Sequence, residues 1–473
     1  MTDAAIVWFR RDLRLRDNTA LTAALKAHKR VFLIFLHAPE EEAPWQPGAA
    51  SNWWLHHSLE HLQQSVIESG GQLVIRQGDS GQNLLDICSE TGAKDVYWNR
   101  LYDPAVAIRD ANHKLLLEQH EIKSHVFSDY LLREPESIVN QQGKPYKVFT
   151  PFSRQYLTDP HQYDLPHPDL ARLSNLPKLQ SLAVSDLSLL KDAAWSKKLE
   201  GFWTPGEQAA RERMEWFVDH NIKGYQESRD LPAIDGISRL SPHLHFGEVS
   251  PRRIWNDSFE ANIQPGAQSL ILPYLRQLVW RDFAHHLLFH FPSSTNHSFQ
   301  KKFESFPWEK NSKLVSTWQK GKTGLPIIDA AMRELWGTGW MHNRCRMLVA
   351  SFLSKNGMQH WNEGAKWFWD TLVDANLANN TMGWQWVAGS GVDAAPYFRI
   401  FDPVTQSKKF DPKAEYIKRW IPELNACSPK EAHQPWLNGV PENVYPEPVL
   451  DASATRKQAL ETFQQFQSAL TEA

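Results

Sequence analysis

The stretch Ala4-Ala5-Ile6-Val7-Trp8-Phe9-Arg10-Arg11-Asp12-Leu13-Arg14 joins a short apolar run to a densely charged turn. An apolar run bounded by such a break predicts a buried β-strand over Ala4–Phe9. Asn18 is a residue type that caps helices, and it predicts a helix that continues to about Lys26. The chain therefore opens with a strand followed by a helix.

The first 130 residues repeat this alternation. Further strands are expected at Arg30–Leu36, Gln72–Arg76, Asp95–Trp98 and Ile122–Phe127, and helices at Ser51–Ile67, Asn83–Glu90 and Pro104–Gln119. Because strands separated by helices pair through crossover connections, the pattern predicts an α/β doubly wound parallel sheet. Ligands bind such a sheet at the carboxyl ends of its strands. The turn at Arg10–Arg14 has no glycine, which argues against an ordinary dinucleotide-binding fingerprint there.

The length of 473 residues is too great for one ordinary core and predicts two domains. We expect an α/β domain over residues 1–130, a connector over 131–205 and an all-α domain over 206–473. Prolines scattered through 158–205 indicate a connector that crosses the surface. From Glu207 onward strand-like runs disappear and helical periodicity dominates, as in Leu270–Leu288 and Pro326–Leu335.

Composition excludes several classes of protein. The formal net charge is −3, so a surface that binds nucleic acid must be a local one. Three cysteines that lie far apart form neither a disulfide framework nor a metal cluster. The pairs His56-His57 and His285-His286 are expected to lack acids at ligand spacing, so no metal is expected. The chain shows no signal peptide and no run of about 18 apolar residues, which predicts a cytoplasmic protein without a membrane anchor.

The chain holds 21 tryptophans, many of them between Trp280 and Trp386. A tryptophan can fill a core, stack on a nucleobase or carry an electron. In the densest stretch, Gly339-Trp340-Met341-His342-Asn343-Arg344-Cys345-Arg346-Met347, the intervening polar residues are Asn, Arg and His. This mixture favours an aromatic, hydrogen-bonding pocket over a plain core. For Trp308, Trp361 and Trp384, which lie in three separate segments, a place in the core is the simplest interpretation.

Two segments suggest ligand binding. Ser238 and Ser241 bracket Arg239 before an expected helix start and could cradle a phosphate, the alternative being a simply capped helix. Gln277, Trp280 and Arg281 share one face of an expected helix and could hold a planar heterocycle. The alternative there is a core tryptophan beside a solvated arginine ion pair.

Taken together, these segments resemble the photolyase/cryptochrome family over nearly the whole chain. The motifs that carry the resemblance are Val7–Arg14, Tyr146–Phe152, Ser238–Pro242, Trp280-Arg281, Gly321–Gly324, Gly339–Met347 and Asp393–Phe401. The resemblance implies an α/β domain followed by a helical domain that holds FAD. It also implies light-driven repair of cyclobutane pyrimidine dimers in DNA.

The resemblance also implies roles for individual residues. Flavin contacts are Tyr225, Ile237, Ser238, Arg239, Leu240, Ser241, Tyr274, Gln277, Arg281, Trp340, Asn343, Arg346, Asp374, Asn376 and Asn380, the last facing the flavin N5. Trp384, Trp361 and Trp308 correspond to the electron-transfer chain. The lesion pocket comprises Gln277, Trp280, Asn343, Met347 and Trp386, and contacts to the DNA backbone come from Arg229, Arg344, Arg399 and Gln406.

Asn343, Met347 and Gln277 indicate which kind of DNA lesion is repaired. Members that repair (6-4) photoproducts usually carry histidines where this chain has Asn343 and Met347, because their chemistry needs a proton transfer that Met cannot perform. Dimer-repairing members usually carry Glu where this chain has Gln277. The alternatives are therefore a cryptochrome-like blue-light photoreceptor with little repair activity, or a (6-4) photolyase. A photoreceptor is disfavoured because the family core runs to about Pro446, leaving under thirty residues for an extension.

A second, light-harvesting chromophore is also implied. The folate-contacting Asn and Glu of one subgroup correspond here to Ala105 and Val106, so that folate site is not expected. Asn99–Arg109 and Trp53–His57 are closer to a subgroup related to plant cryptochromes, which favours methenyltetrahydrofolate bound elsewhere over a deazaflavin or no antenna. The expected partner is UV-damaged DNA, bound by a monomer that associates with the nucleoid.

Overall fold

The computed structural model describes residues 3–158, 162–190, 193–262, 264, 266–397 and 399–472. The chain forms two compact units. Unit 1 comprises Met1–Tyr225 and Ser238–Pro292, and unit 2 comprises Gln226–Ile237 and Ser293–Ala473.

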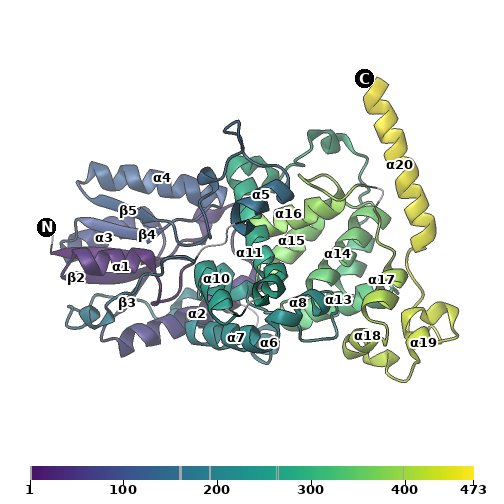
Figure 1. Ribbon diagram of the computed structural model, residues 1–473, viewed down its shortest axis with the longest axis horizontal. Coiled ribbons are helices and arrows are strands. Elements are labelled where there is room, and N and C mark those ends of the chain that lie inside the picture. The colour runs from purple at the N-terminus through teal and green to yellow at the C-terminus, as the bar shows by residue number, and fades with distance from the viewer. Residues whose placement is uncertain are drawn as a thin grey trace. The chain divides into compact units, whose positions relative to one another are not determined.

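A five-stranded parallel sheet forms the centre of the N-terminal part of unit 1 (Figure 1). Its strands are β1 (Ala4–Phe9), β2 (Arg30–His37), β3 (Leu73–Gln77), β4 (Asp95–Asn99) and β5 (Lys123–Phe127), in the order β3-β2-β1-β4-β5. Ile6 of β1 is in register with Phe32 on one side and Val96 on the other. The strand order therefore reverses at β1, and the predicted doubly wound sheet is confirmed.

Four helices make the crossovers, α1 (Thr19–Ala27), α2 (Ala49–Glu68), α3 (Ser80–Thr91) and α4 (Pro104–Gln119). Asn18 caps α1 as expected, because its Oδ1 accepts the Leu21 N–H at 3.1 Å. Helices α3 and α4 cover one face of the sheet, over a core that includes Trp8 and Trp98. Every strand and helix predicted before residue 130 is present, with ends displaced by at most three residues.

The segment expected to be a surface connector is more structured than its prolines predict. It contains the 3-10 turns η3 (Leu170–Leu173) and η4 (Val184–Leu187) and then α6 (Ala193–Glu200). Leu173 and Leu199 are fully buried, and the Arg172 side chain donates to the backbone carbonyl of His28 at 2.9 Å. In its described residues the connector is therefore anchored at these three positions. Pro160 lies outside the described residues.

The rest of unit 1 is helical. It comprises α5 (Phe149–Leu157), α7 (Glu207–His220), α9 (Ser241–Phe246), α10 (Pro251–Glu260) and α11 (Ala267–His290). The last of these contains the helix predicted at Leu270–Leu288.

Unit 2 is built from helices. They include α12 (Ser312–Gln319), α13 (Pro326–Thr338), α14 (Asn343–Ser351), α15 (Trp361–Thr371), α16 (Leu377–Ala388), α17 (Pro403–Phe410), α18 (Glu415–Trp420), α19 (Pro429–His433) and α20 (Ala452–Glu472). A π-helical turn, η8 (Phe352–Asn356), directly follows α14. In its described residues unit 2 has no strand, as the sequence predicts, and shows only an isolated bridge between Glu309 and Gln359. None of the helices described in either unit is both long and apolar enough to cross a membrane.

Candidate functional site

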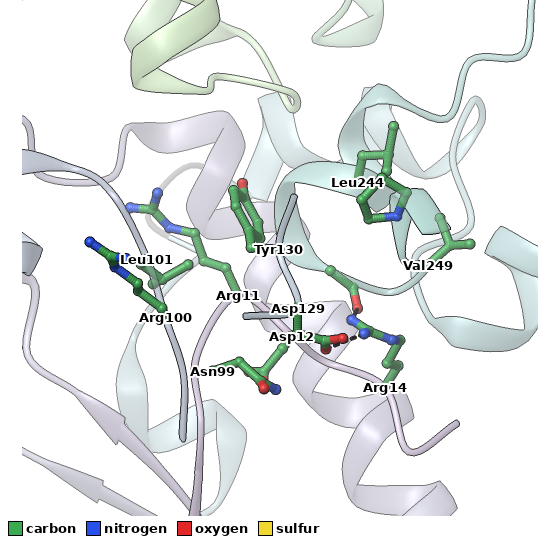
Figure 2. Close-up of a pocket in the computed structure, with 12 residues that line it drawn as sticks. Arg11, Asp12, Arg14, Asn99, Arg100, Leu101, Asp129, Tyr130, Leu244 and Val249 are labelled. Atoms are coloured by element: carbon green, nitrogen blue, oxygen red, sulfur yellow. Dashed lines mark hydrogen bonds and ion pairs between the residues drawn. The ribbon is translucent and has the colours of Figure 1, made fainter. Parts of the chain in front are cut away.

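The crevice at the carboxyl ends of β1 and β4 is filled by charged side chains (Figure 2). Arg14 pairs with Asp129 and donates to the carbonyl of Gly247 at 2.9 Å. Asn99 donates to Asp12 at 2.6 Å. Burial raises the pKa of Asp12, although hydrogen bonds to its carboxylate lower it. The remaining cavity is about 10 Å³, roughly the room that one water needs, so a flat ligand does not fit here.

Further ion pairs surround this crevice. Arg10 pairs with Asp110 at 2.5 Å, and Arg11 pairs with Glu42 at 2.7 Å and with Asp103. The charged turn that follows β1 is therefore an internal ionic scaffold.

In unit 1, two of the candidate flavin residues before α9, Ser238 and Tyr225, contact Tyr274. The Tyr274 hydroxyl hydrogen-bonds Ser238, and its ring lies 5.4 Å from that of Tyr225. Arg239 adopts a left-handed backbone conformation with φ 54°, and the N-cap of α9 is Leu240, which has no side-chain cap. The alternative of a simply capped helix is therefore wrong, because an apolar residue occupies the cap position. Ser241 is the first residue of α9.

On α11, Gln277 and Arg281 both donate hydrogen bonds to backbone carbonyls. Gln277 is half-buried and its amide donates to the carbonyl of Pro273 at 3.1 Å. Arg281 is only 7% exposed, donates to the carbonyls of Tyr130 at 2.7 Å and Leu244 at 3.3 Å, and stacks on the Tyr130 ring. The helix that was predicted to place Gln277, Trp280 and Arg281 on one face is present. The alternative of a solvated ion pair is wrong for Arg281, because the guanidinium is buried and donates to backbone carbonyls.

Trp280 lies against an aromatic ring that the sequence did not single out. The Phe149 ring is parallel to the indole within 4°, with centroids 3.4 Å apart. The guanidinium of Arg276 lies 4.7 Å from the Phe149 centroid, and Phe283 packs edge-on against both rings. Trp280 is half-buried, so its indole remains partly accessible from solvent.

In unit 2, a second group of candidate flavin residues comes from α14 and α16. Arg346 donates to both carboxylate oxygens of Asp374, at 3.0 and 2.8 Å, and its Cζ lies 5.9 Å from the Trp340 ring. Asn376 caps α16, and the amide of Asn380 donates to the carbonyl of Ala365 at 2.9 Å. Ile237 is half-buried at the end of its segment.

The three candidate electron-transfer tryptophans are in unit 2, and they differ in exposure. Trp361 is fully buried, Trp384 is 2% exposed and Trp308 is half-buried. Their indole N–H groups are buried and find no hydrogen-bond acceptor among the described residues. The ring of His360 lies 5.4 Å from Trp361 and 5.5 Å from Trp308, a position that sequence reasoning missed. Burial lowers the pKa of His360, which keeps the ring neutral near pH 7.

The space that Trp384 occupies exists because residue 364 is glycine. A Cβ at Gly364 would lie 1.9 Å from the indole Cη2 of Trp384. On its other sides Trp384 packs against Phe368 and Trp318, with ring centroids 5.0 and 6.1 Å away.

A basic hollow of about 670 Å³ lies on unit 2. Its charged and amide lining residues are Asp230, Arg344, Arg399, Asp402, Gln406, Lys409 and Arg456. Arg344 is held by Asp230 at 2.8 Å and stacks on Phe410, whereas the Arg399 side chain is exposed. The hollow therefore brings together three of the four predicted backbone contacts. Arg229, the fourth, is half-buried and does not line it.

Lys409 and Arg456 were missed by sequence reasoning, because only the fold brings them to this hollow.

The lesion-pocket candidates of unit 2 lie on two helices. Asn343 is exposed and Met347 half-buried on α14, and Trp386 is half-buried on α16.

One expectation about histidines is wrong. Glu60, one helical turn beyond His56-His57, accepts hydrogen bonds from both rings, at 3.3 and 3.1 Å, and the donor atoms of all three residues lie within 4.8 Å. In contrast, His285 and His286 contact backbone carbonyls.

The comparisons with known proteins cover both units. A family model described as "FAD binding domain of DNA photolyase" matches residues 274–465, and one described as "DNA photolyase" matches residues 5–170. The deoxyribodipyrimidine photo-lyase of Agrobacterium fabrum (strain C58) is 41% identical, over 98% of this chain and 98% of its own length. Cryptochrome-1 of Arabidopsis thaliana is 35% identical, over 98% of this chain and 71% of its own length.

Solved structures agree with these matches. A bacterial class III photolyase from Agrobacterium tumefaciens has a TM-score of 0.93 at 40% identity, over 99% of this chain and 98% of that chain. An archaeal photolyase from Sulfolobus tokodaii, described with two FAD molecules, has a TM-score of 0.82 at 29% identity, over 98% and 100%. The chain therefore belongs to the DNA photolyase/cryptochrome family, with an FAD-binding domain, and is an enzyme of the photo-lyase class.

Proposed function

We propose that this protein repairs cyclobutane pyrimidine dimers in DNA, using light. The observation that carries the proposal is the pair Asn343 and Met347, which stand one turn apart on α14. Neither side chain transfers a proton near neutral pH, and splitting a cyclobutane ring needs only an electron that arrives and returns. A (6-4) photoproduct would need a proton donor at this place.

The residues present fit FAD. Ser238 and Arg239 precede a helix whose N-cap has no side-chain cap, and Arg346 with Asp374 offers a paired cation and carboxylate beside Trp340. We propose that these residues, with Tyr225, Tyr274, Asn376 and Asn380, bind the cofactor. When bound in its reduced form, FAD would supply the light-driven electron transfer to the dimer. The protein's contribution is to bind, orient and exclude water.

We propose separate roles for residues that contact the lesion, the DNA backbone and the electron-transfer path. Trp280, backed by Phe149, offers an indole face on which a flipped base can stack, worth about 1–3 kcal/mol. One amide hydrogen of Gln277 is used by Pro273, and the other remains for a carbonyl of the lesion. We propose that Arg399, Arg344 and Gln406 in the basic hollow contact the DNA backbone. Trp384, Trp361 and Trp308 would carry electrons for photoreduction of the oxidised cofactor.

A repair assay with two lesions tests this function. The reduced protein is incubated with an oligonucleotide that contains a cyclobutane dimer and separately with one that contains a (6-4) photoproduct, illuminated, and the products are resolved. We expect repair of the dimer alone and none in the dark. Repair of the (6-4) lesion would contradict the interpretation of Asn343 and Met347.

A photoreceptor is the second candidate, and two observations favour it. Gln277 differs from the glutamate expected of dimer-repairing members, and Cryptochrome-1 of Arabidopsis thaliana is 35% identical. If both lesions stay intact while the cofactor is still photoreduced, this second function replaces the first.

We propose that an antenna chromophore, if bound, lies outside the crevice of Figure 2, because the ionic scaffold fills that crevice. Methenyltetrahydrofolate is favoured over a deazaflavin. The two FAD molecules of the Sulfolobus tokodaii protein add a second flavin as a candidate. Mass spectrometry of chromophores released from the purified protein distinguishes these cases.

We further propose that the protein acts as a monomer on UV-damaged DNA in the nucleoid.

A further inference from the structure

Lys355 is a fully buried lysine in the π-helical turn η8. Its Nζ donates to the backbone carbonyl of Arg399 at 3.0 Å and lies 5.4 Å from the centroid of the Tyr397 ring. No carboxylate among the described residues forms an ion pair with it. Burying an ammonium group without a counter-charge is costly, and π-helical turns recur at functional sites.

The charged groups on the elements packed against η8 do not supply that counter-charge. Among the side chains that the structure describes, they are Arg344 and Arg346 on α14, Glu363, Lys366 and Asp370 on α15, and Arg456, Lys457 and Glu461 on α20, with none on α16. The charged group that acts on Lys355 is Arg399, a second cation. Burial, reinforced by Arg399, lowers the pKa of Lys355 to about 7.

The helical turn that contains Ser351 and Lys355 also anchors the segment that carries Arg399. The Ser351 hydroxyl accepts the N–H of Phe401 at 3.2 Å, and Lys355 holds the carbonyl of Arg399. The side chain of Arg399 lines the basic hollow, together with Arg344 and further cations. The buried ammonium thus sits directly behind an exposed guanidinium, separated from it by the backbone of one residue.

We infer that Lys355 couples the binding of a nucleic-acid phosphate at Arg399 to the uptake of one proton. The inference rests on the proposed DNA-binding function of the hollow. A phosphate beside Arg399 offsets the positive charge that disfavours a protonated Lys355. The protonated ammonium in turn makes a stronger, charge-assisted hydrogen bond to the Arg399 carbonyl and fixes the segment that carries the guanidinium. Lys355 is therefore a positioning residue for Arg399.

The affinity for DNA is expected to fall as the pH rises above about 7. Below about pH 7 Lys355 is already protonated in the free protein, so DNA binding takes up no proton. Above that pH the free protein has lost the proton and must regain it on binding. Affinity for DNA should therefore weaken as the pH rises from 7 to 9, by up to about tenfold per pH unit.

Calorimetry of the holoprotein tests this coupling. We would titrate an undamaged DNA duplex at pH 8 in two buffers that differ in ionisation enthalpy, and obtain the protons taken up from the difference in observed heat. Wild type should take up close to one proton, and Lys355→Met should take up none. Lys409→Met, on the rim of the hollow, should flatten the salt dependence but keep the proton uptake. Lys457→Met, on the exposed face of α20, should change neither.

Proton uptake by Lys355→Met equal to that of wild type would overturn the inference. If that variant does not fold, Arg399→Met provides the same test, because it removes the group that links phosphate to lysine. Wild type that binds DNA and repairs dimers without taking up a proton would overturn this inference alone. Wild type that does not bind DNA would overturn the proposed function as well.

Discussion

Phe149 lies flat against Trp280, with ring centroids 3.4 Å apart and planes inclined by 4°. Phe149 is itself 1% exposed and is held by Phe283 and Arg276, so it forms a fixed support behind a half-buried indole. A stacking platform binds a base well only if its own orientation is fixed before the base arrives. We therefore propose that Phe149 supports recognition of the lesion as well as the core.

Replacing Phe149 should weaken lesion recognition more than general DNA binding. Phe149→Leu keeps most of the volume but removes the flat face, and we expect the ratio of affinities for dimer-containing and undamaged DNA to fall several-fold. Phe149→Ala should also cost about 3–5 kcal/mol of folding stability. Titrations with the two DNAs, together with denaturant unfolding, separate the effects. An unchanged ratio for Phe149→Leu would remove Phe149 from recognition.

Trp384→Phe should block photoreduction of the oxidised cofactor while leaving repair by chemically reduced enzyme intact, because that repair does not draw on the tryptophan chain. Trp318→Phe is the matched control. Trp318 is also buried and contacts Trp384, but its indole N–H is bound by the Val349 carbonyl at 3.2 Å. Absorbance under steady blue light follows the reduction. Equal photoreduction in wild type and Trp384→Phe would exclude Trp384 as the donor.

Asp230→Asn should tighten DNA binding. The carboxylate holds Arg344 at 2.8 Å, so its removal frees a guanidinium for a phosphate. We expect a few-fold gain in affinity and a salt dependence steeper by about one counterion. Asp402→Asn removes the same charge from the same hollow without releasing an arginine, and should steepen the salt dependence less. Affinities measured across a salt series would show whether the two variants differ.

Gln277→Ala should lower both dimer affinity and repair yield, since a carbonyl of the lesion would lose its donor at a cost of about 1–3 kcal/mol. Gln277→Glu should keep or raise the quantum yield of repair, because a protonated or well-solvated carboxyl stabilises the electron-rich dimer. The measurement is repaired product per absorbed photon. If wild type repairs no dimer and Gln277→Glu changes nothing, the photoreceptor function gains support.

Lys355 should make the free energy of unfolding depend on pH even when no DNA is present. Burial lowers its pKa in the native state to about 7, whereas the unfolded chain binds the proton up to about pH 10.4. Between these values the unfolded state holds more protons, so the free energy of unfolding rises with pH, by at most about 1.4 kcal/mol per unit. Lys355→Met removes this contribution. Urea unfolding of both proteins at pH 7, 8 and 9 should show a smaller slope for the variant.

The sequence predicts the sheet well because local rules are sufficient there. Apolar runs such as Ala4–Phe9 and a cap such as Asn18 specify strands and helices without knowledge of their neighbours. The surroundings of Arg281 were not predicted, because helical periodicity shows on which face of α11 it lies but not that the carbonyls of Tyr130 and Leu244 accept its hydrogen bonds. Lys355 was missed for a related reason. A lysine is expected at the surface, and only the packed fold shows it buried.

Contacts between residues that lie far apart in the sequence could not be predicted from it either. Phe149 and Trp280 belong to different motifs, and periodicity cannot reveal that their rings meet. The hollow on unit 2 gathers residues from α14, α17 and α20, and only two of its four cations were anticipated. The roles of the site residues remain predictions that rest on family resemblance, and the experiments above test them.

Gly364 sets the position of Trp384 by having no side chain. The indole occupies the volume in which any other residue would place its first carbon. Electron tunnelling falls steeply with distance, so a shift of an ångström or two at this ring changes the rate of transfer. Under the proposed role of Trp384 in photoreduction, the absence of a side chain at Gly364 therefore sets how far the electron travels to or from this ring.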